Sequence, residues 1–163
     1  LRLKSLNLFT LPAIREITVD PWWMYVQSAD MTDEEAEEED KRAREIEASV
    51  PFKTKTLGPT APPADFKPVA FIDYIISLKH EAATLGWIKN EGIVNSLDVK
   101  LENAKKAIER NNIRPAKNLL EAFINEVEAQ GCASYDKCPE GKHITPEGYG
   151  LLKYNAEYLL GRL

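Results

Sequence analysis

The residues of this chain that could do chemistry gather in one short segment near its C-terminal end. Cys132 and Cys138 are the only two cysteines, separated by residues 133–137, and Asp136 and His143 lie close to them in sequence. Two thiols at this spacing can form a disulfide, stay free, or act as zinc ligands together with Asp136 and His143. The spacing matches no usual zinc finger, and the residues alone leave the three alternatives open.

No residue pattern typical of an enzyme accompanies this segment. His80 lies beside Glu81, but no serine or cysteine occurs in a recognisable nucleophile motif, and glutamates are frequent throughout the chain. The carboxylates of residues 30–47 lack the alternating spacing and the turn glycine of a calcium loop. Outside the cysteine segment, the sequence therefore predicts no catalytic residue, no cofactor and no metal site.

Composition argues against a membrane span and against a polyanionic partner. No apolar run approaches the roughly 20 residues that a membrane-spanning helix needs. The net charge of -5 disfavours nucleic acid as a ligand, and the excess of acids is concentrated in residues 30–47. We expect a partner, if there is one, to be another protein domain or subunit.

The elements that hold the cysteine segment in place are predicted to be helices. Residues 86–130 contain two series of apolar side chains at steps of three or four: Ile93, Leu97, Leu101, Ala104 and Ile108, then Ala116, Leu119, Leu120, Phe123, Ile124 and Val127. Asn111-Asn112 tolerates a turn, and Pro115 favours the first turn of a helix. We therefore predict two antiparallel helices, with a core made by Ile93, Leu97, Leu101, Leu119, Phe123 and Val127.

Two flanking segments show the same periodicity and predict two more helices. The upstream series ends at Gly86, a plausible helix end, and runs through Phe71, Ile72, Ile75, Leu78, Ala82 and Leu85. The downstream series starts with Thr145-Pro146-Glu147 as N-cap and first turn, and continues through Leu151, Leu152, Tyr154, Tyr158 and Leu159. The predicted fold is mainly α, with a four-helix bundle over residues 69–163.

Three short runs within this region resemble a known family. They are Gly92-Ile93-Val94-Asn95-Ser96-Leu97 with Lys100-Leu101, then residues 117–127 with the segment Ala122-Phe123-Ile124-Asn125-Glu126-Val127, and finally Gly141-Lys142-His143-Ile144-Thr145. Together they resemble the FIMAH module, a small helical appendage of secreted bacterial and archaeal proteins that often accompanies hydrolase domains. The resemblance covers about residues 71–163. Glu91 departs from the usual small polar residue, and the loop of Cys132 and Cys138 is longer than usual.

The resemblance implies an extracellular accessory module without known catalysis. In that setting the even number of cysteines favours a disulfide between Cys132 and Cys138 over zinc binding or free thiols.

The first 29 residues are a different kind of sequence, which we interpret as a strand-rich arm or the end of a preceding domain. Leu1–Lys4, Leu6–Leu8 and Ile14–Val19 are short and partly alternating, so they predict strands. Trp22, Trp23, Met24 and Tyr25 follow as a dense apolar group, and we interpret them as an interface with another domain or subunit. The alternative is burial against the helices of the same chain.

Residues 30–50 predict an acidic, solvated helix, because Thr32 and Glu35 form a capping box ahead of further acids. Residues 51–68, with the run Gly58-Pro59-Thr60-Ala61-Pro62-Pro63, are interpreted as a Pro-rich linker that marks a domain boundary.

Three function classes fit these expectations. The first is a noncatalytic interaction module of an extracellular or cell-surface protein, which docks on another domain through its N-terminal arm. The second is the C-terminal fragment of a secreted hydrolase with its active site outside this chain. The third is a structural subunit of a surface filament or layer that pairs with further copies of itself through its strands.

Overall fold

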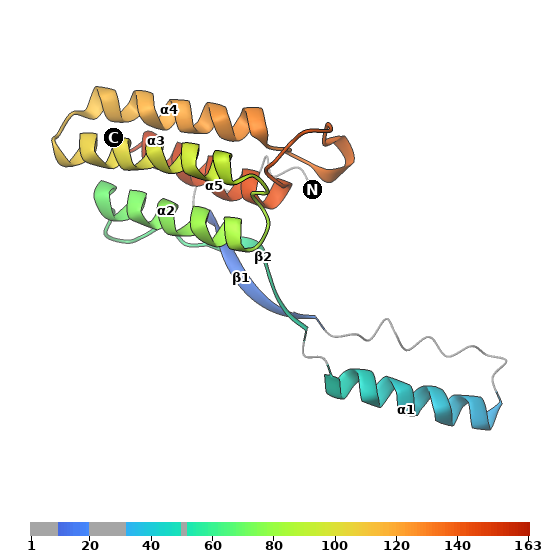
Figure 1. The fold of residues 1–163 in the computed structure, drawn as a ribbon. Helices are drawn as coiled ribbons and strands as arrows, with labels where there is room; N and C mark the ends of the chain where they lie inside the picture. The colour runs from blue at the N-terminus through green and yellow to red at the C-terminus, as the bar shows by residue number, and fades with distance from the viewer. Residues whose placement is uncertain (1–9, 20–31, 50–51) are drawn as a thin grey trace. The chain divides into compact units, whose positions relative to one another are not determined.

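The structure, a computed structural model that describes residues 10–19, 32–49 and 52–163, is mainly helical with one small antiparallel sheet. In chain order the elements are β1 (Leu11–Val19), α1 (Asp33–Ser49), β2 (Phe52–Thr60), α2 (Pro68–Thr84), α3 (Glu91–Glu109), α4 (Ile113–Gln130), the 3-10 turn η2 (Tyr135–Lys137) and α5 (Pro146–Leu160) (Figure 1). The chain divides into two compact units, one made of Leu1–Ile14 with Leu57–Leu163 and the other of Arg15–Thr56. The mainly α fold class is confirmed.

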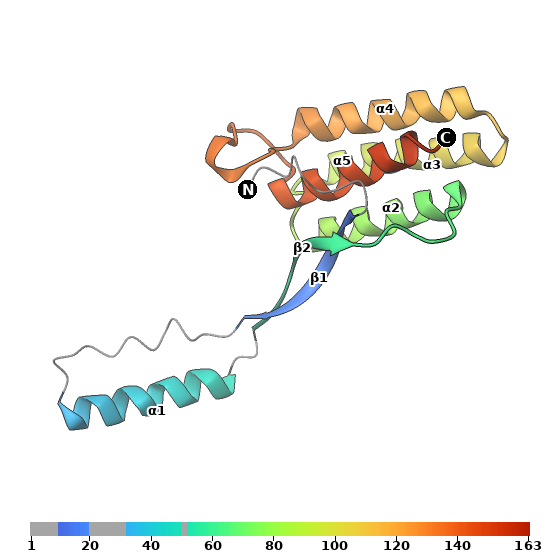
Figure 2. The same ribbon diagram turned by 180° about the vertical axis from the view of Figure 1, so that it is seen from behind.

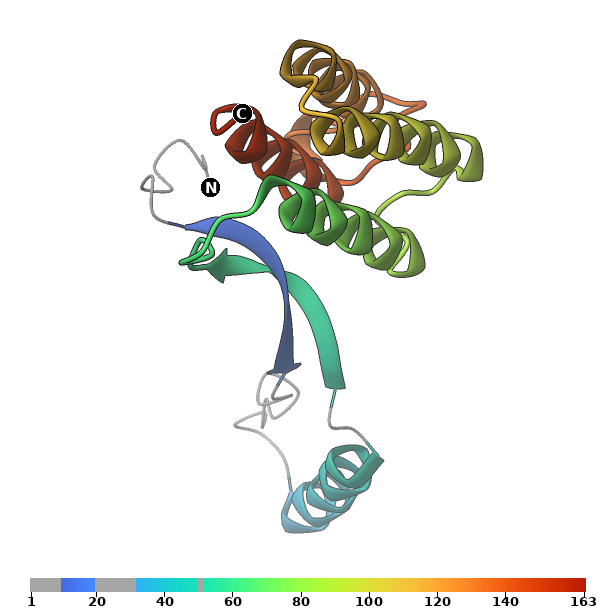
Figure 3. The same cartoon turned by 90° about the vertical axis from the view of Figure 1, so that its left-hand side faces the viewer.

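The first unit, here called the helical unit, is built around α2 to α5. Helix α3 packs against α2 and α4, and α5 packs against the same two helices from the other side, as the views from behind and from the end show (Figures 2 and 3). The fully buried side chains come from all four helices: Ile72, Ile75, Leu97, Leu101, Leu120, Phe123, Val127, Leu151, Leu152 and Leu159. The four predicted apolar series thus supply one shared core.

The predicted core residues are buried with one exception. Ile93, Leu97, Leu101, Phe123 and Val127 lie in the core, whereas Leu119 is only half-buried and its neighbour Leu120 is fully buried. The same shift occurs in α3, where Ala107 is buried and Ile108 half-buried. Adjacent apolar residues on one helix face compete for the same position, and periodicity does not decide between them.

The helix ends largely follow the local chemistry of the sequence. Asn111 has a left-handed φ of 58° in the turn between α3 and α4, and Gly86 has a φ of 73° just after α2. Thr145 caps α5, since its Oγ1 accepts from Gly148 N at 3.4 Å. Helix α4 begins at Ile113 rather than at Pro115, which lies within its first turn, where a missing N–H is tolerated.

The interpretation of residues 51–68 as a linker is wrong for its first half. Residues 52–60 form β2, which pairs with β1 in a two-stranded sheet, so only residues 61–67 connect β2 to α2. Gly58 and Pro59 suggested a tether, but both occur in a strand of a sheet that has only two strands, where a missing N–H or side chain costs little.

The interpretation of residues 1–29 as an arm or the end of a preceding domain is wrong for the start of β1. Strand β1 starts at Leu11, three residues before the predicted position, and pairs with β2. Leu11 and Ala13 are buried in the helical unit, and Asn155 Nδ2 donates to the carbonyl oxygen of Pro12 at 2.9 Å. The start of β1 is therefore part of the helical unit.

The second unit, Arg15–Thr56, contains the end of β1, helix α1 and the start of β2. Residues 15–18 of β1 and 53–55 of β2 are exposed, and Lys53 pairs with Glu16 at 3.3 Å. The capping box predicted for α1 is confirmed: Glu35 N donates to Thr32 Oγ1 at 3.4 Å, and Thr32 N donates to Glu35 Oε2 at 3.0 Å. The hydrogen bond that the Thr32 backbone donates to the Glu35 carboxylate is the main reason why the pKa of Glu35 lies below its ordinary value. The hydrogen bond from the Thr32 side chain adds to this effect.

Candidate functional site

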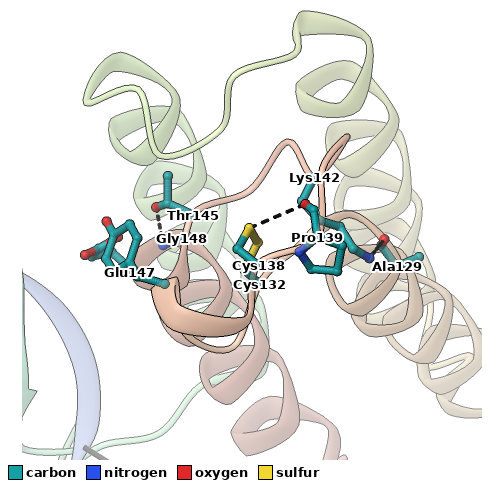
Figure 4. The surroundings of a disulfide bond; sticks show 9 residues. Ala129, Cys132, Cys138, Pro139, Lys142, Thr145, Glu147 and Gly148 are labelled. Carbon is teal, nitrogen blue, oxygen red and sulfur yellow. Dashed lines mark hydrogen bonds between the residues drawn. A yellow bond between two sulfur atoms is a disulfide. The ribbon is translucent and has the colours of Figure 1, made fainter.

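The cysteine segment forms the connection between α4 and α5. Cys132 and Cys138 lie at disulfide distance, with Cα atoms 5.2 Å apart, on either side of η2 (Figure 4). Cys132 is buried, with 3% of its surface exposed, whereas Cys138 is exposed. One end of the small ring is therefore fixed in the helical unit and the other end faces solvent.

Backbone hydrogen bonds hold the base of this connection. Ile144 is buried at its centre, where its N–H donates to Gln130 O at 3.0 Å and its carbonyl accepts from Cys132 N at 3.1 Å. Thr145 N donates to Trp87 O at 2.9 Å, which ties the connection to the loop between α2 and α3. Lys142 Nζ also donates to Ala129 O near the C-terminal end of α4, where a cation is favourable.

Tyr135 is the most exposed large apolar side chain among the described residues, at 67%. Its hydroxyl donates to Glu147 Oε2 in the first turn of α5 at 2.7 Å. This hydrogen bond, with smaller effects of desolvation and of the carboxylate charge, raises the pKa of Tyr135 to about 12. The loop therefore presents one aromatic ring whose position is fixed at its hydroxyl end.

The structure favours the disulfide over the zinc alternative. A sulfur atom engaged in a disulfide is not a thiolate and so is not available as a zinc ligand. Asp136 and His143 do not complete a site with the cysteines, because no group of three or more His, Cys, Asp or Glu side chains within residues 10–19, 32–49 and 52–163 is arranged to hold a metal ion. In the same ranges no helix is long and apolar enough to cross a membrane.

The residues that carry the family resemblance have structural roles in this chain. Ser96 Oγ donates to Glu126 Oε2 at 3.0 Å, and Lys100 Nζ donates to Ser96 Oγ at 2.9 Å and pairs with Glu126 at 2.7 Å. This partly buried network joins α3 to α4. In the third run, Gly141 adopts a left-handed φ of 81° and Ile144 enters the core. The three runs thus describe how the helices fit together.

His80 is exposed at the surface of α2. Its Nε2 lies 3.4 Å from Asp98 Oδ1 on α3, and the other carboxylate oxygen of Asp98 contacts Nζ of Lys79. Lys79 is fully buried. Sequence reasoning missed Lys79, although its position four residues after Ile75 and three before Ala82 places it on the buried face of α2.

Helices α4 and α5 are joined by a similar contact. Lys153 Nζ donates to Glu128 Oε1 and, at 3.2 Å, to the hydroxyl of Tyr149. Burial opposes the charge of Lys153, but these hydrogen bonds outweigh it and hold its pKa above the ordinary value. A strongly held ammonium of this kind stabilises the fold and cannot serve as a base.

One cavity of the helical unit is mainly apolar. It has a volume of about 290 Å³ and is lined by residues that include Leu11, Pro63, Phe71 and Tyr74, with Asp65 and Lys67 at its edge. Asp65 and Lys67 pair with each other at 3.0 Å and are largely exposed. The cavity lies where the start of β1, the segment after β2 and the first turns of α2 meet.

The predicted interface residues Trp22, Trp23, Met24 and Tyr25 lie outside the described residues. Their place in a partner surface stays a prediction. Comparison of the chain with protein-family models, with curated proteins and with solved structures finds no match.

Proposed function

We propose that this chain is a noncatalytic interaction module of an extracellular or cell-surface protein, in which a FIMAH-like four-helix bundle carries an N-terminal arm. The observation that carries the proposal is the two-stranded ribbon of β1 and β2. Leu11 and Ala13 of β1 are buried in the helical unit, whereas residues 15–18 of β1 and 53–55 of β2 are exposed. A ribbon of two strands has little stability by itself in water, and its edges can bind a further strand.

The two edges of the ribbon differ in a way that favours β1 as the binding edge. Residues 53–55 of β2 include Lys53 and Lys55. Lysine at a sheet edge opposes the addition of another strand. Residues 15–18 of β1 contain no lysine, and Ile17 is 41% exposed. A strand supplied by the partner would cover this edge, and Trp22 and Trp23 would extend the contact.

The cysteine pair supports the extracellular part of the proposal. Disulfides persist in oxidising compartments and are rare in the cytosol. Cys138 is exposed, so a reducing environment would have access to the pair. A disulfide at this position is of use mainly to a protein that works outside the cytosol.

The proposal is tested by the solution state of the full chain and by its variants. Light scattering coupled to size exclusion should give a monomer, and the parent organism's surface fraction should contain a partner that copurifies with the wild type. Ile17→Pro should abolish copurification of that partner, and the double variant Trp22→Ala, Trp23→Ala should weaken it by several kcal/mol if both are anchors. Lys55→Pro on the other strand is the matched control and should retain the partner.

The exposed β1 edge also suits the second candidate, a subunit of a surface filament or layer. That function predicts concentration-dependent oligomers of the purified chain, and Ile17→Pro should then return them to monomers. A monomeric wild type whose localisation is cytosolic would contradict both functions.

A further inference from the structure

Several lysines of the helical unit pair with a carboxylate on a neighbouring helix, and one of them differs in its surroundings. Lys105 pairs with Asp73 at 2.6 Å and Lys100 with Glu126 at 2.7 Å, with 26% and 27% of the lysine side chain exposed. Lys79, which contacts Asp98 between α2 and α3, is 0% exposed. It is the largest fully buried side chain of the described residues.

Lys79 also lacks the second partner that other lysines have. Lys100 donates to Ser96 Oγ as well as pairing with Glu126, and Lys153 donates to Tyr149 Oη as well as to Glu128. Nζ of Lys79 touches Asp98 Oδ2, yet it makes no hydrogen bond of normal geometry within the described part of the chain. An ammonium has three N–H donors, and burying them unsatisfied is costly.

We propose that Lys79 and Asp98 condense into an amide that links α2 to α3. One proton first passes from Nζ to the carboxylate that it touches. The lone pair of Nζ then attacks Cγ of Asp98, and a C–N bond forms. One C–O bond breaks, Nζ gives up one proton, and the leaving hydroxyl departs with it as water. No oxidant or reductant is needed, because amine and acid become amide and water.

Two features of the site assist this reaction. The contact between Nζ and the carboxyl group gives the amine a high effective concentration, which replaces the usual activation of the acid. His80 Nε2 lies 3.4 Å from Asp98 Oδ1, so it is placed to deliver a proton to the departing oxygen. Asp98 is 26% exposed, so the water has a route to solvent.

The product suits its surroundings better than the ion pair does. An amide carries no net charge and has one N–H in place of three, so the buried charge of Lys79 and the partly buried charge of Asp98 both disappear. The bond would fix α2 to α3 in a way that reducing agents do not reverse, unlike the link between Cys132 and Cys138. The proposal does not depend on the interaction function proposed above.

The test is the intact mass of the full chain after reduction and alkylation. We expect a mass lower by one water than the sequence requires, and a protease digest that contains a branched peptide with Lys79 joined to Asp98. Asp98→Ala should restore the full mass. Asp73→Ala is the matched control, because it removes an exposed ion pair between the same two helices, and it should keep the deficit. His80→Ala should slow formation of the cross-link in freshly refolded protein.

A wild-type chain of full mass would overturn the proposal, and so would a deficit that maps to a cyclic imide elsewhere without the branched peptide. The wild-type measurement decides the question even if Asp98→Ala does not fold. An unchanged rate in His80→Ala would overturn the part assigned to that histidine.

Discussion

Phe123 lies at the centre of the helical unit, where its ring is fully buried with side chains of α2, α3 and α5 in one core. Replacing it by alanine removes a large apolar surface and leaves a cavity that the surrounding helices only partly fill. We expect Phe123→Ala to lower the free energy of unfolding by about 3 to 5 kcal/mol in urea denaturation. Val99→Ala, at a position 60% exposed on α3, should change it by less than about 0.5 kcal/mol. A loss under about 1 kcal/mol for Phe123→Ala would place the core elsewhere.

Tyr135 provides a prediction about pH at the same scale. Its pKa of about 12 exceeds the ordinary value of 10 because the hydroxyl donates to the Glu147 carboxylate. The stability that the hydrogen bond between Tyr135 and Glu147 contributes is therefore fully present below about pH 10, and it is lost as the pH rises through about 12. In Glu147→Gln, NMR titration of the Tyr135 ring should show a pKa near the ordinary value. Equal pKa values in the wild type and the variant would mean that the hydrogen bond does not form in solution.

At the scale of elements, the start of α5 approaches the loop between α2 and α3 closely. A Cβ atom on Gly148 would lie 2.9 Å from both Ile144 Cγ2 and the carbonyl oxygen of Trp87. Gly148→Ala should therefore destabilise the chain by about 1 to 3 kcal/mol, through a shift of backbone or core. Gly161→Ala, with its nearest contact at 3.5 Å, is the control and should be close to neutral in the same thermal melts.

The connection between α4 and α5 gives a second prediction for an element. Its base is held by the backbone bonds of Ile144, and the cysteine ring encloses only residues 133–137. A ring this small restricts the unfolded chain little, so Cys132→Ser with Cys138→Ser should cost no more than about 2 to 3 kcal/mol. When the unreduced wild type is treated with an alkylating agent, mass spectrometry should find no alkylated thiol. Two reactive thiols, or stoichiometric zinc lost with them, would contradict the disulfide.

For the whole molecule, we expect residues 64–163 to fold alone, but with less stability than the full chain. The four helices share a core, yet Leu11 belongs to it and Leu57 packs against it from β2. Loss of Leu11 burial alone should cost about 1.5 to 3 kcal/mol. Helical circular dichroism and a cooperative but earlier urea transition would support this. An unfolded fragment would show that the ribbon is required for the helical unit to fold.

The helices could be derived from the sequence because their information is local. Steps of three and four between apolar residues place them on one face, and Asn111, Gly86 and Thr145 end or begin helices through their own backbone and side-chain preferences. The capping box at Thr32 and the proximity of the two cysteines are equally local. These features need no knowledge of distant parts of the chain.

The tertiary structure decided the features that depend on residues far apart in sequence. The sequence of β2 resembles a linker because its glycine and proline interrupt the alternation of a strand, and its pairing with β1 joins segments separated by the whole of α1. Asn155 Nδ2 donates to the carbonyl oxygen of Pro12, 143 residues earlier in the sequence. Lys79 pairs with Asp98 only because folding brings α2 and α3 together. Sequence pattern determines which face of an element is apolar, but only packing determines which polar groups are enclosed with it.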